Sequence, residues 1–280
     1  METANNAMIM IMLSAAFLMY LASSATYFLY LFFQKDSMQK TGLWLVCAGF
    51  LIHFASIGIA TYSMGALPVK NLQQTFFIAS LALAGMFIVL QCRLNLKILG
   101  ILVSPLLVIM MAAAFLMPET VSANEPVLKG FWLVAHIIMI FTGEAALAMA
   151  CGTGILYLIQ ENAIKSKKRG FFYNRLPSLD MLDSTGYSCI AAGFVMLTFG
   201  LITGFIYAKS IWGNFFRWDP KEIWSMVTWL VYAALLHGRL TSGWRGKRSA
   251  IMAIIGFTIL IFTFLGVNFF IGGYHQVFTR

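Results

Sequence analysis

Residues 184–208, STGYSCIAAGFVMLTFGLITGFIYA, decide the fold class of this chain. No charged side chain interrupts this stretch, and it exceeds the roughly 20 apolar residues that a helix needs to cross a bilayer. Seven more runs of this kind lie at 7–33, 43–62, 72–91, 96–117, 131–159, 221–240 and 250–271. Isolated strands cannot satisfy their backbone in lipid, so the sequence predicts an all-α polytopic membrane protein with eight transmembrane helices.

Composition agrees with this fold class. Of the 280 residues, 60% are hydrophobic and 10% are charged, whereas about 25% are charged in a typical soluble domain. The formal net charge of +9 would suggest nucleic acid as a partner of a soluble protein. Here the basic residues lie in short loops between apolar runs, so we expect no nucleic-acid partner and contact with membrane lipid instead.

The cysteines and the first residues exclude several classes. None of the four cysteines forms a C-x-x-C pair, so a disulfide framework, a zinc ribbon and a thioredoxin-like site are unsupported. The absence of C-x-x-C-H indicates that the chain is not itself a c-type cytochrome. The opening run lacks a basic n-region and is too long for a cleavable signal peptide.

The distribution of basic residues predicts the orientation. Of 19 basic residues, 13 follow the first, third, fifth or seventh run: Lys35, Lys40, Arg93, Lys97, Lys165, Lys167, Lys168, Arg169, Arg175, Arg239, Arg245, Lys247 and Arg248. Because basic loops stay on the cytoplasmic side, both termini are predicted outside. We expect a multi-pass protein of the bacterial cytoplasmic membrane, or of an equivalent membrane.

An aromatic loop at 209–220, KSIWGNFFRWDP, then lies on the outer face. Trp212, Phe215, Phe216 and Trp218 belong to it, and Trp224 follows within the next helix. Such rings could form an interfacial belt. Clustered around a hinge at Gly213 and Asn214, they instead indicate a platform for a flat, apolar ligand.

The end of this loop predicts a helix start. Asp219 is a candidate N-cap, Pro220 suits the first helical position and Glu222 suits the third. Arg217 and Lys221 are cations beside the aromatic rings, and either could meet ligand carboxylates or lipid phosphates.

The chain has four histidines, all in or beside membrane runs. His136 and His275 are predicted at the level of the aromatic loop, which suits axial ligation of a heme iron. His53 lies in the middle of the second run and His237 near the inner end of the seventh. A membrane histidine also commonly bridges helices by hydrogen bonds. Glu144 is the acidic residue inside a span, and its partner is not evident from the sequence.

These residues resemble a known family. WGNFFRWDPKEIW is similar to the tryptophan-rich "WWD" signature of heme-handling proteins in cytochrome c biogenesis, and DPKE followed by IWSMVTWLVYAALLH resembles its CcsA/ResC branch. RLPSLDMLD, GFVMLTFGLITGFIYA, GVNFFIGGYH and GALPVKNLQQ also resemble the family, the last with Asn71 and Gln74 as a helix cap. Phe216, Gln74 and Ala66 depart from its usual Trp, Glu and His.

The resemblance implies one eight-span membrane domain, 1–280, with 209–224 as an outer-face, heme-binding segment. It implies a heme-handling subunit of the System II cytochrome c synthetase, a heme lyase that acts with a CcsB/ResB partner on apocytochrome c. Heme b would be bound and presented, and a thiol-reducing thioredoxin-like protein is a further candidate partner. The implied contacts to heme are His136 and His275 as axial ligands, His237 as a transit ligand, and Trp212, Gly213, Phe216, Arg217, Trp218, Asp219 and Trp224. No side chain is predicted to act as nucleophile or general base.

Three rival functions share these features. A HemX-type regulator of tetrapyrrole synthesis would need no pair of outer histidines. A CcmC-like permease subunit of a heme exporter would continue differently after Asp219. A structural membrane scaffold would use the aromatic rings as a belt alone.

Overall fold

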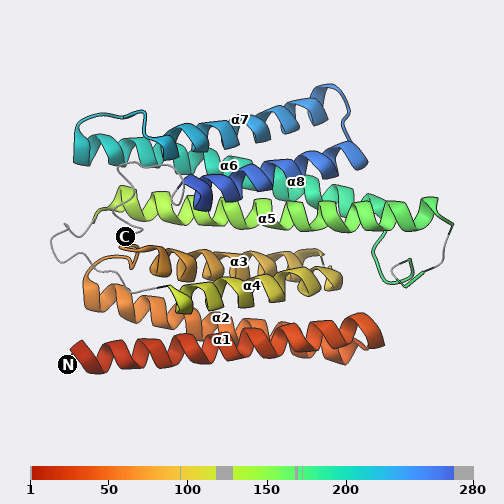
Figure 1. Ribbon diagram of the computed structural model, residues 1–280, viewed down its shortest axis with the longest axis horizontal. Coiled ribbons are helices and arrows are strands. Elements are labelled where there is room, and N and C mark those ends of the chain that lie inside the picture. Colours follow the sequence, from red (N-terminus) through yellow and green to blue (C-terminus); the bar gives the residue numbers. More distant parts are fainter. Residues whose placement is uncertain (1, 95, 118–128, 168–169, 172, 268–280) are drawn as a thin grey trace. The chain divides into compact units, whose positions relative to one another are not determined.

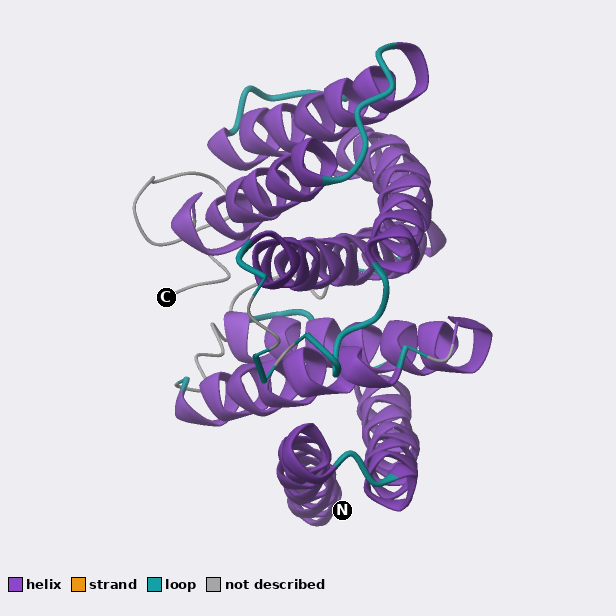
Figure 2. Ribbon diagram, turned by 90° about the vertical axis from the view of Figure 1, so that its right-hand side faces the viewer, coloured by secondary structure: helices purple, strands orange, loops and turns teal. Residues whose placement is uncertain are grey.

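The computed structural model describes residues 2–94, 96–117, 129–167, 170–171 and 173–267. Every regular element in these ranges is a helix (Figures 1 and 2). The chain divides into two compact units, residues 1–129 and 130–280. The predicted all-α membrane fold is therefore confirmed.

The first unit contains α1 (Glu2–Phe33), α2 (Asp36–Met64), α3 (Leu72–Leu94), the short 3-10 turn η1 (Lys97–Leu99) and α4 (Gly100–Leu116). Helix α1 packs on α2 and α4, and α3 packs on α4 and α2. The predicted cap of α3 is confirmed, because Asn71 Oδ1 accepts from the Gln74 N–H at 2.9 Å and Gln74 Oε1 accepts from the Lys70 N–H at 2.8 Å.

His53 lies at the centre of this unit, fully buried on α2. Its Nδ1 is 3.5 Å from the Tyr20 hydroxyl of α1, and its ring packs edge-on against Phe77 of α3 at 6.2 Å. Phe77 in turn contacts Phe115 of α4. Four helices therefore meet around His53, and these are the contacts of a core side chain.

The second unit contains α5 (Phe131–Lys165), α6 (Leu179–Trp212), α7 (Pro220–Thr241), α8 (Lys247–Ile261) and the π-helical turn η2 (Phe262–Gly266). Helix α5 packs most extensively on α6 and next on α8, while α7 packs on α8 and α6. The starts of α5 and α7 and the ends of α6 and α8 meet at one end of this unit (Figure 1). We call this end the loop end, because it carries the aromatic loop.

Small residues bring α5 and α6 close together. A Cβ on Gly143 of α5 would meet the Gly193 carbonyl oxygen and the Leu197 nitrogen of α6 at 3.1 Å. A Cβ on Gly200 of α6 would meet Ile140 of α5 at 2.6 Å. Helices in lipid gain association energy from such close packing, since the hydrophobic effect does not drive them together.

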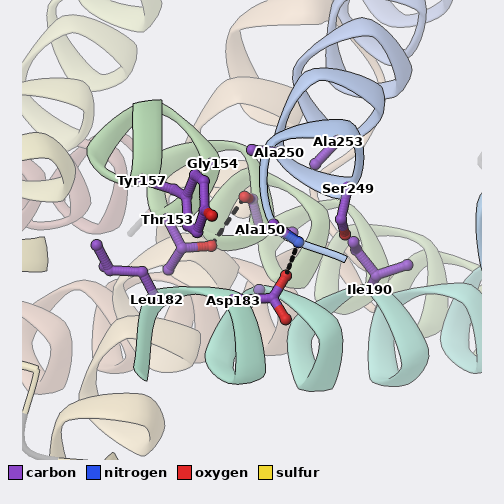
Figure 3. Close-up of a pocket in the computed structure, with 12 residues that line it drawn as sticks. Ala150, Thr153, Gly154, Tyr157, Leu182, Asp183, Ile190, Ser249, Ala250 and Ala253 are labelled. Atoms are coloured by element: carbon purple, nitrogen blue, oxygen red, sulfur yellow. Dashed lines mark hydrogen bonds between the residues drawn. The ribbon is translucent and has the colours of Figure 1, made fainter. Parts of the chain in front are cut away.

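The opposite end of this unit is held by a clamp formed by Asp183, Arg239, Gly246 and Ser249. Asp183 and Ser249 are shown in Figure 3. Arg239 of α7 donates two hydrogen bonds to the Asp183 carboxylate of α6, at 2.9 and 2.8 Å. Asp183 also accepts from the Gly246 N–H at 2.9 Å, and Arg239 lies 3.4 Å from the Ser249 hydroxyl. The clamp joins α6, α7 and the start of α8. The adjoining cavity has a volume of about 10 Å³, room for about one water molecule.

The helix boundaries refine the sequence prediction. Among the described residues, seven helical segments are long and apolar enough to span a membrane, so the chain is a multi-pass membrane protein. The seventh predicted run forms the 22-residue α7, which is long enough to cross but carries charged residues at both ends. Several helices extend beyond the predicted apolar runs, because a helix can continue into the polar interface. Helix α5, for example, ends at Lys165, whereas its apolar run was predicted to end at residue 159.

Candidate functional site

The candidate site lies at the loop end of the second unit. His136 comes from the second turn of α5, and residues 200–212 form the last turns of α6. The aromatic loop then leads into the first turn of α7. The fold thus brings together the predicted His136 and the aromatic loop.

A backbone carbonyl of α6 fixes the imidazole of His136. Nδ1 lies 2.7 Å from the carbonyl oxygen of Gly200. A carbonyl oxygen only accepts, so Nδ1 is the protonated nitrogen and the lone pair of the neutral ring is on Nε2. Metal-binding histidines are commonly oriented in this way, with one ring N–H on a carbonyl and the other nitrogen on the metal.

Gly204 provides the space for this ring. A Cβ at position 204 would lie 2.7 Å from His136 Nδ1 and 2.8 Å from its Cε1. The imidazole therefore sits directly over the backbone of α6, one turn beyond the Gly200 carbonyl that it contacts.

Gly204→Ala should displace the His136 ring or force α5 and α6 apart. We expect a loss of about 1–3 kcal/mol in stability, typical of overpacking, and weaker retention of any ligand held by His136. Thermal unfolding and the visible absorption of the purified protein measure these effects. Gly58→Ala is the matched control, because a Cβ on Gly58 would meet nothing within 4 Å; equal behaviour of the two variants would contradict the assigned role of Gly204.

The aromatic loop is joined to this part of α6 by ring contacts. Phe205, next to Gly204 in the chain, packs edge-on against Phe216 with ring centroids 5.9 Å apart. Phe216 packs edge-on against Trp218 at 5.1 Å. A continuous series of rings therefore runs from Phe205, near the end of α6, to Trp218 in the loop.

The loop backbone is shaped by Gly213 and by Trp218. Gly213 ends α6 with a φ of 79°, and its N–H donates to the Lys209 carbonyl at 3.0 Å. Trp218 has a φ of 59°, which is unusual for a bulky residue. Strained conformations of this kind concentrate at functional sites.

Glu222 binds the backbone N–H groups of the two residues that flank Trp218. Its Oε2 accepts from the Arg217 N–H at 2.8 Å and from the Asp219 N–H at 3.4 Å. Asp219 is 4% exposed, and its Oδ1 accepts from the Lys221 N–H at 2.9 Å. The predicted cap with Pro220 at the first helical position is thereby confirmed as a capping box, and Glu222 also fixes the shape of the loop.

Several rings of the loop are open to the surroundings of the second unit. The side chain of Trp218 is 77% exposed, and those of Phe215 and Trp212 are exposed as well. Trp224 lies differently: it is half-buried and packs on Phe262 of η2 at 4.7 Å. The loop itself therefore presents the platform, while Trp224 packs within the unit.

One cation interacts with Glu144 in the second unit. The charge of Lys221, at the start of α7, interacts with the charge of the Glu144 carboxylate on α5. An acidic residue inside a membrane span is expected to have a compensating positive charge.

Within the second unit, His237 is not brought to His136. His237 is exposed near the far end of α7, about 27 Å along the helix from Asp219 at 1.5 Å per residue. The predicted second outer ligand, His275, lies outside the described residues. In the part of the chain that is described, no group of three His, Cys, Asp or Glu side chains could hold a bare metal ion.

Three features that position the site residues were not predicted from the sequence. They are the Gly200 carbonyl that binds His136, the space left by Gly204 for the His136 ring, and the hydrogen bonds from the loop to Glu222. The spacing of Gly193, Gly200 and Gly204 along α6 was the available signal for close helix packing. Nothing in the sequence indicated which helix would approach them.

Comparison with known proteins shows the family to which the chain belongs. The family model "Cytochrome C assembly protein" matches residues 8–275. A CcsA cytochrome c biogenesis protein of Prochlorococcus marinus is 33% identical over 239 residues, which cover 76% of each chain. The CcsA protein of Guillardia theta is 31% identical over 280 residues, which cover 93% of each chain.

A solved structure shares the fold. It is titled "Cytochrome c Heme Lyase CcmF", and it superposes with a TM-score of 0.64 at 15% sequence identity. The match covers 93% of this chain but 47% of the solved chain, so this protein spans about half the length of that neighbour. The match to the family model and the extent of identity to the CcsA proteins show that this chain belongs to the cytochrome c assembly protein family, with CcsA proteins as its curated relatives.

Proposed function

We propose that the protein is the heme-handling subunit of a cytochrome c synthetase. It would bind heme b at the loop end and present it for thioether formation with the cysteines of a CxxCH segment in apocytochrome c. The observation that supports this most directly is the tautomer of His136: its Nδ1–H is committed to the Gly200 carbonyl, so the Nε2 lone pair suits an iron atom.

The exposed rings of the loop suit the second part of the proposal. A porphyrin is flat and apolar, and aromatic side chains bind such a surface by stacking. A platform open to the outside, rather than an enclosed pocket, leaves the edge of the macrocycle accessible to a protein substrate. We infer that Trp218 and its neighbours fix the plane of heme, while His136 and His275 hold its iron.

The reaction itself requires little from side chains. A cysteine thiol adds across a heme vinyl group, so that the S–H bond and the vinyl π bond are replaced by an S–C and a C–H bond. Holding the two reactants together can supply much of the rate enhancement of such a step. Accordingly, we assign no nucleophile or general base to this chain.

The location and partners form part of the same proposal. Basic residues of the second unit, among them Arg239 and Lys247, lie at the end opposite the loop. The positive-inside rule then places the loop outside, with both termini, in a bacterial cytoplasmic membrane. A CcsB/ResB-type membrane protein would complete the synthetase, and a thioredoxin-like protein would keep the substrate cysteines reduced.

The test is the absorption spectrum of the purified protein, with and without its co-expressed CcsB/ResB-type partner. We expect a Soret band from bound heme, and heme-stained cytochrome c when apocytochrome is also expressed. A protein that carries no heme in either preparation, and whose deletion leaves cytochrome c levels unchanged, would contradict the proposal. That result would favour a HemX-type regulator or a structural scaffold. Heme export that depends on an ATPase partner would favour the CcmC-like permease.

A further inference from the structure

Two cations are held against the aromatic loop of the second unit. Lys209, in the last turn of α6, places its Nζ 4.2 Å from the ring centroid of Phe215. The guanidinium carbon of Arg217 lies 4.9 Å from the ring centroid of Trp212. Both distances are within the range of a cation–π contact.

These contacts fold the loop back over the end of α6. Lys209 and Trp212 are three residues apart on one helix, so their side chains are neighbours on the same face. Phe215 and Arg217 approach this face from the loop. The positive charges of Lys209 and Arg217 are therefore brought to one side of the platform, although the two residues are eight positions apart in the chain.

The third cation of this segment has a different environment. Lys221 follows the cap of α7, and its charge interacts with Glu144 and Asp219 inside the unit. Lys209, in contrast, is exposed, and it forms no ion pair with any of the described residues. Two cations thus lie in contact with rings of the platform, whereas the charge of Lys221 interacts with acidic groups of the protein.

The backbone of Arg217 is also held in place. Its N–H is bound by Glu222, and Trp218 follows in a left-handed conformation with its ring exposed. Arg217 and the most exposed ring of the loop are thus fixed next to each other. The guanidinium group lies over Trp212, so a planar ligand lying on the exposed rings of the loop would have this cation beside it.

We propose that Lys209 and Arg217 bind the two carboxylates of the planar macrocycle that the aromatic loop carries. This inference rests on the proposed function, and it identifies the ligand as a dicarboxylate held by its charged edge. Guanidinium groups bind carboxylates through two parallel hydrogen bonds, and an ammonium group adds a point charge. The alternative is that both cations serve lipid phosphates, as cations at an interface often do.

Heme and its dimethyl ester distinguish these alternatives, because the ester keeps the ring and the iron but has no carboxylate charge. Both are titrated by Soret absorption into the purified protein in nanodiscs of uncharged phosphatidylcholine. We expect the wild type to bind the diacid at least about tenfold more tightly, since a hydrogen bond to a charged group contributes about that factor or more. Lys209→Met and Arg217→Gln should each reduce this preference, and the double variant should abolish it. Lys165→Met, which removes an exposed cation from α5, is the matched control and should keep it.

The outcomes separate this inference from the function on which it rests. If the wild type binds both forms equally well, or if the double variant keeps the preference, the inference is wrong while heme binding stands. If the variants lose only their binding to vesicles containing phosphatidylglycerol, the cations serve lipid and the inference is again wrong. If the wild type binds neither form, with or without its partner, the proposed function fails and the inference fails with it.

Discussion

His136→Ala should abolish the Soret band of the purified protein, or shift it to that of weakly held heme. The variant removes the imidazole whose Nδ1 donates to the Gly200 carbonyl at 2.7 Å. Without this ligand, one axial position of the iron is left to water or to a chance donor. We expect cytochrome c maturation to fall at least tenfold, as measured by heme staining of a co-expressed apocytochrome.

Two further measurements separate loss of the ligand from loss of the fold. Imidazole added to His136→Ala can enter the vacated space beside Gly204 and should restore both the Soret band and part of the maturation. His136→Asn places its amide Nδ2 where Nδ1 of the imidazole lies and can still donate to the Gly200 carbonyl, but it offers no imidazole nitrogen, so it should fold normally and lack heme. Full maturation in either variant without added imidazole would contradict the assignment of His136.

Asp183→Ala should produce the largest loss of stability in the second unit. The Asp183 and Arg239 side chains are only 13% and 10% exposed, and they share two hydrogen bonds. Removing one member of such a pair leaves the other charge buried and unpaired, which costs about 3–5 kcal/mol. The Gly246 N–H also loses its acceptor. Unfolding of the purified protein in detergent, followed by heat or denaturant, measures the change.

Replacing both members supplies the control for this prediction. In Asp183→Leu with Arg239→Met no charge remains unpaired, and apolar replacements of a buried ion pair are often neutral or stabilising. The double variant should therefore recover most of the stability. Lys165→Ala breaks a surface pair with Glu161 and should change stability by about 0–1 kcal/mol. If Asp183→Ala were no more destabilising than Lys165→Ala, the clamp would have no stabilising role.

The fold was largely predictable from sequence, because membrane helices have a simple requirement for about 20 apolar residues. Residues 184–208 met that requirement by themselves, and α6 contains them. The caps at Asn71 and Asp219 were also predictable, since each depends on residues only three positions apart. The extent of the helices was not, because polar residues such as those at the end of α5 can be helical outside the apolar layer.

The candidate residues of the site were predictable from the sequence, but the contacts and the backbone conformation that position them were not. His136 and Trp218 stood out because histidine and clustered rings are unusual in a membrane chain. The interaction of Lys221 with Glu144 could not be found from the sequence, since Glu144 lies 77 positions earlier and only the fold of the second unit lets the two charges interact. The left-handed backbone of Trp218 was equally hidden, because it arises from the bonds of Glu222 to the peptide groups around it. Long-range packing, not local pattern, determines these features.

The clamp at Asp183 and Arg239 also has a mechanical consequence. Helix α7 runs about 30 Å from this ion pair to the loop, at 1.5 Å per residue, and hydrogen bonds between Thr228 and Thr263 and from Trp229 to Thr198 hold its middle. Because Glu222, in the first turn, binds the loop, a tilt of α7 by about 5° around the ion pair would move the rings by roughly 2.5 Å over this length. The contacts along α7, at its far end and at its middle, therefore determine how accurately the rings of the loop are positioned.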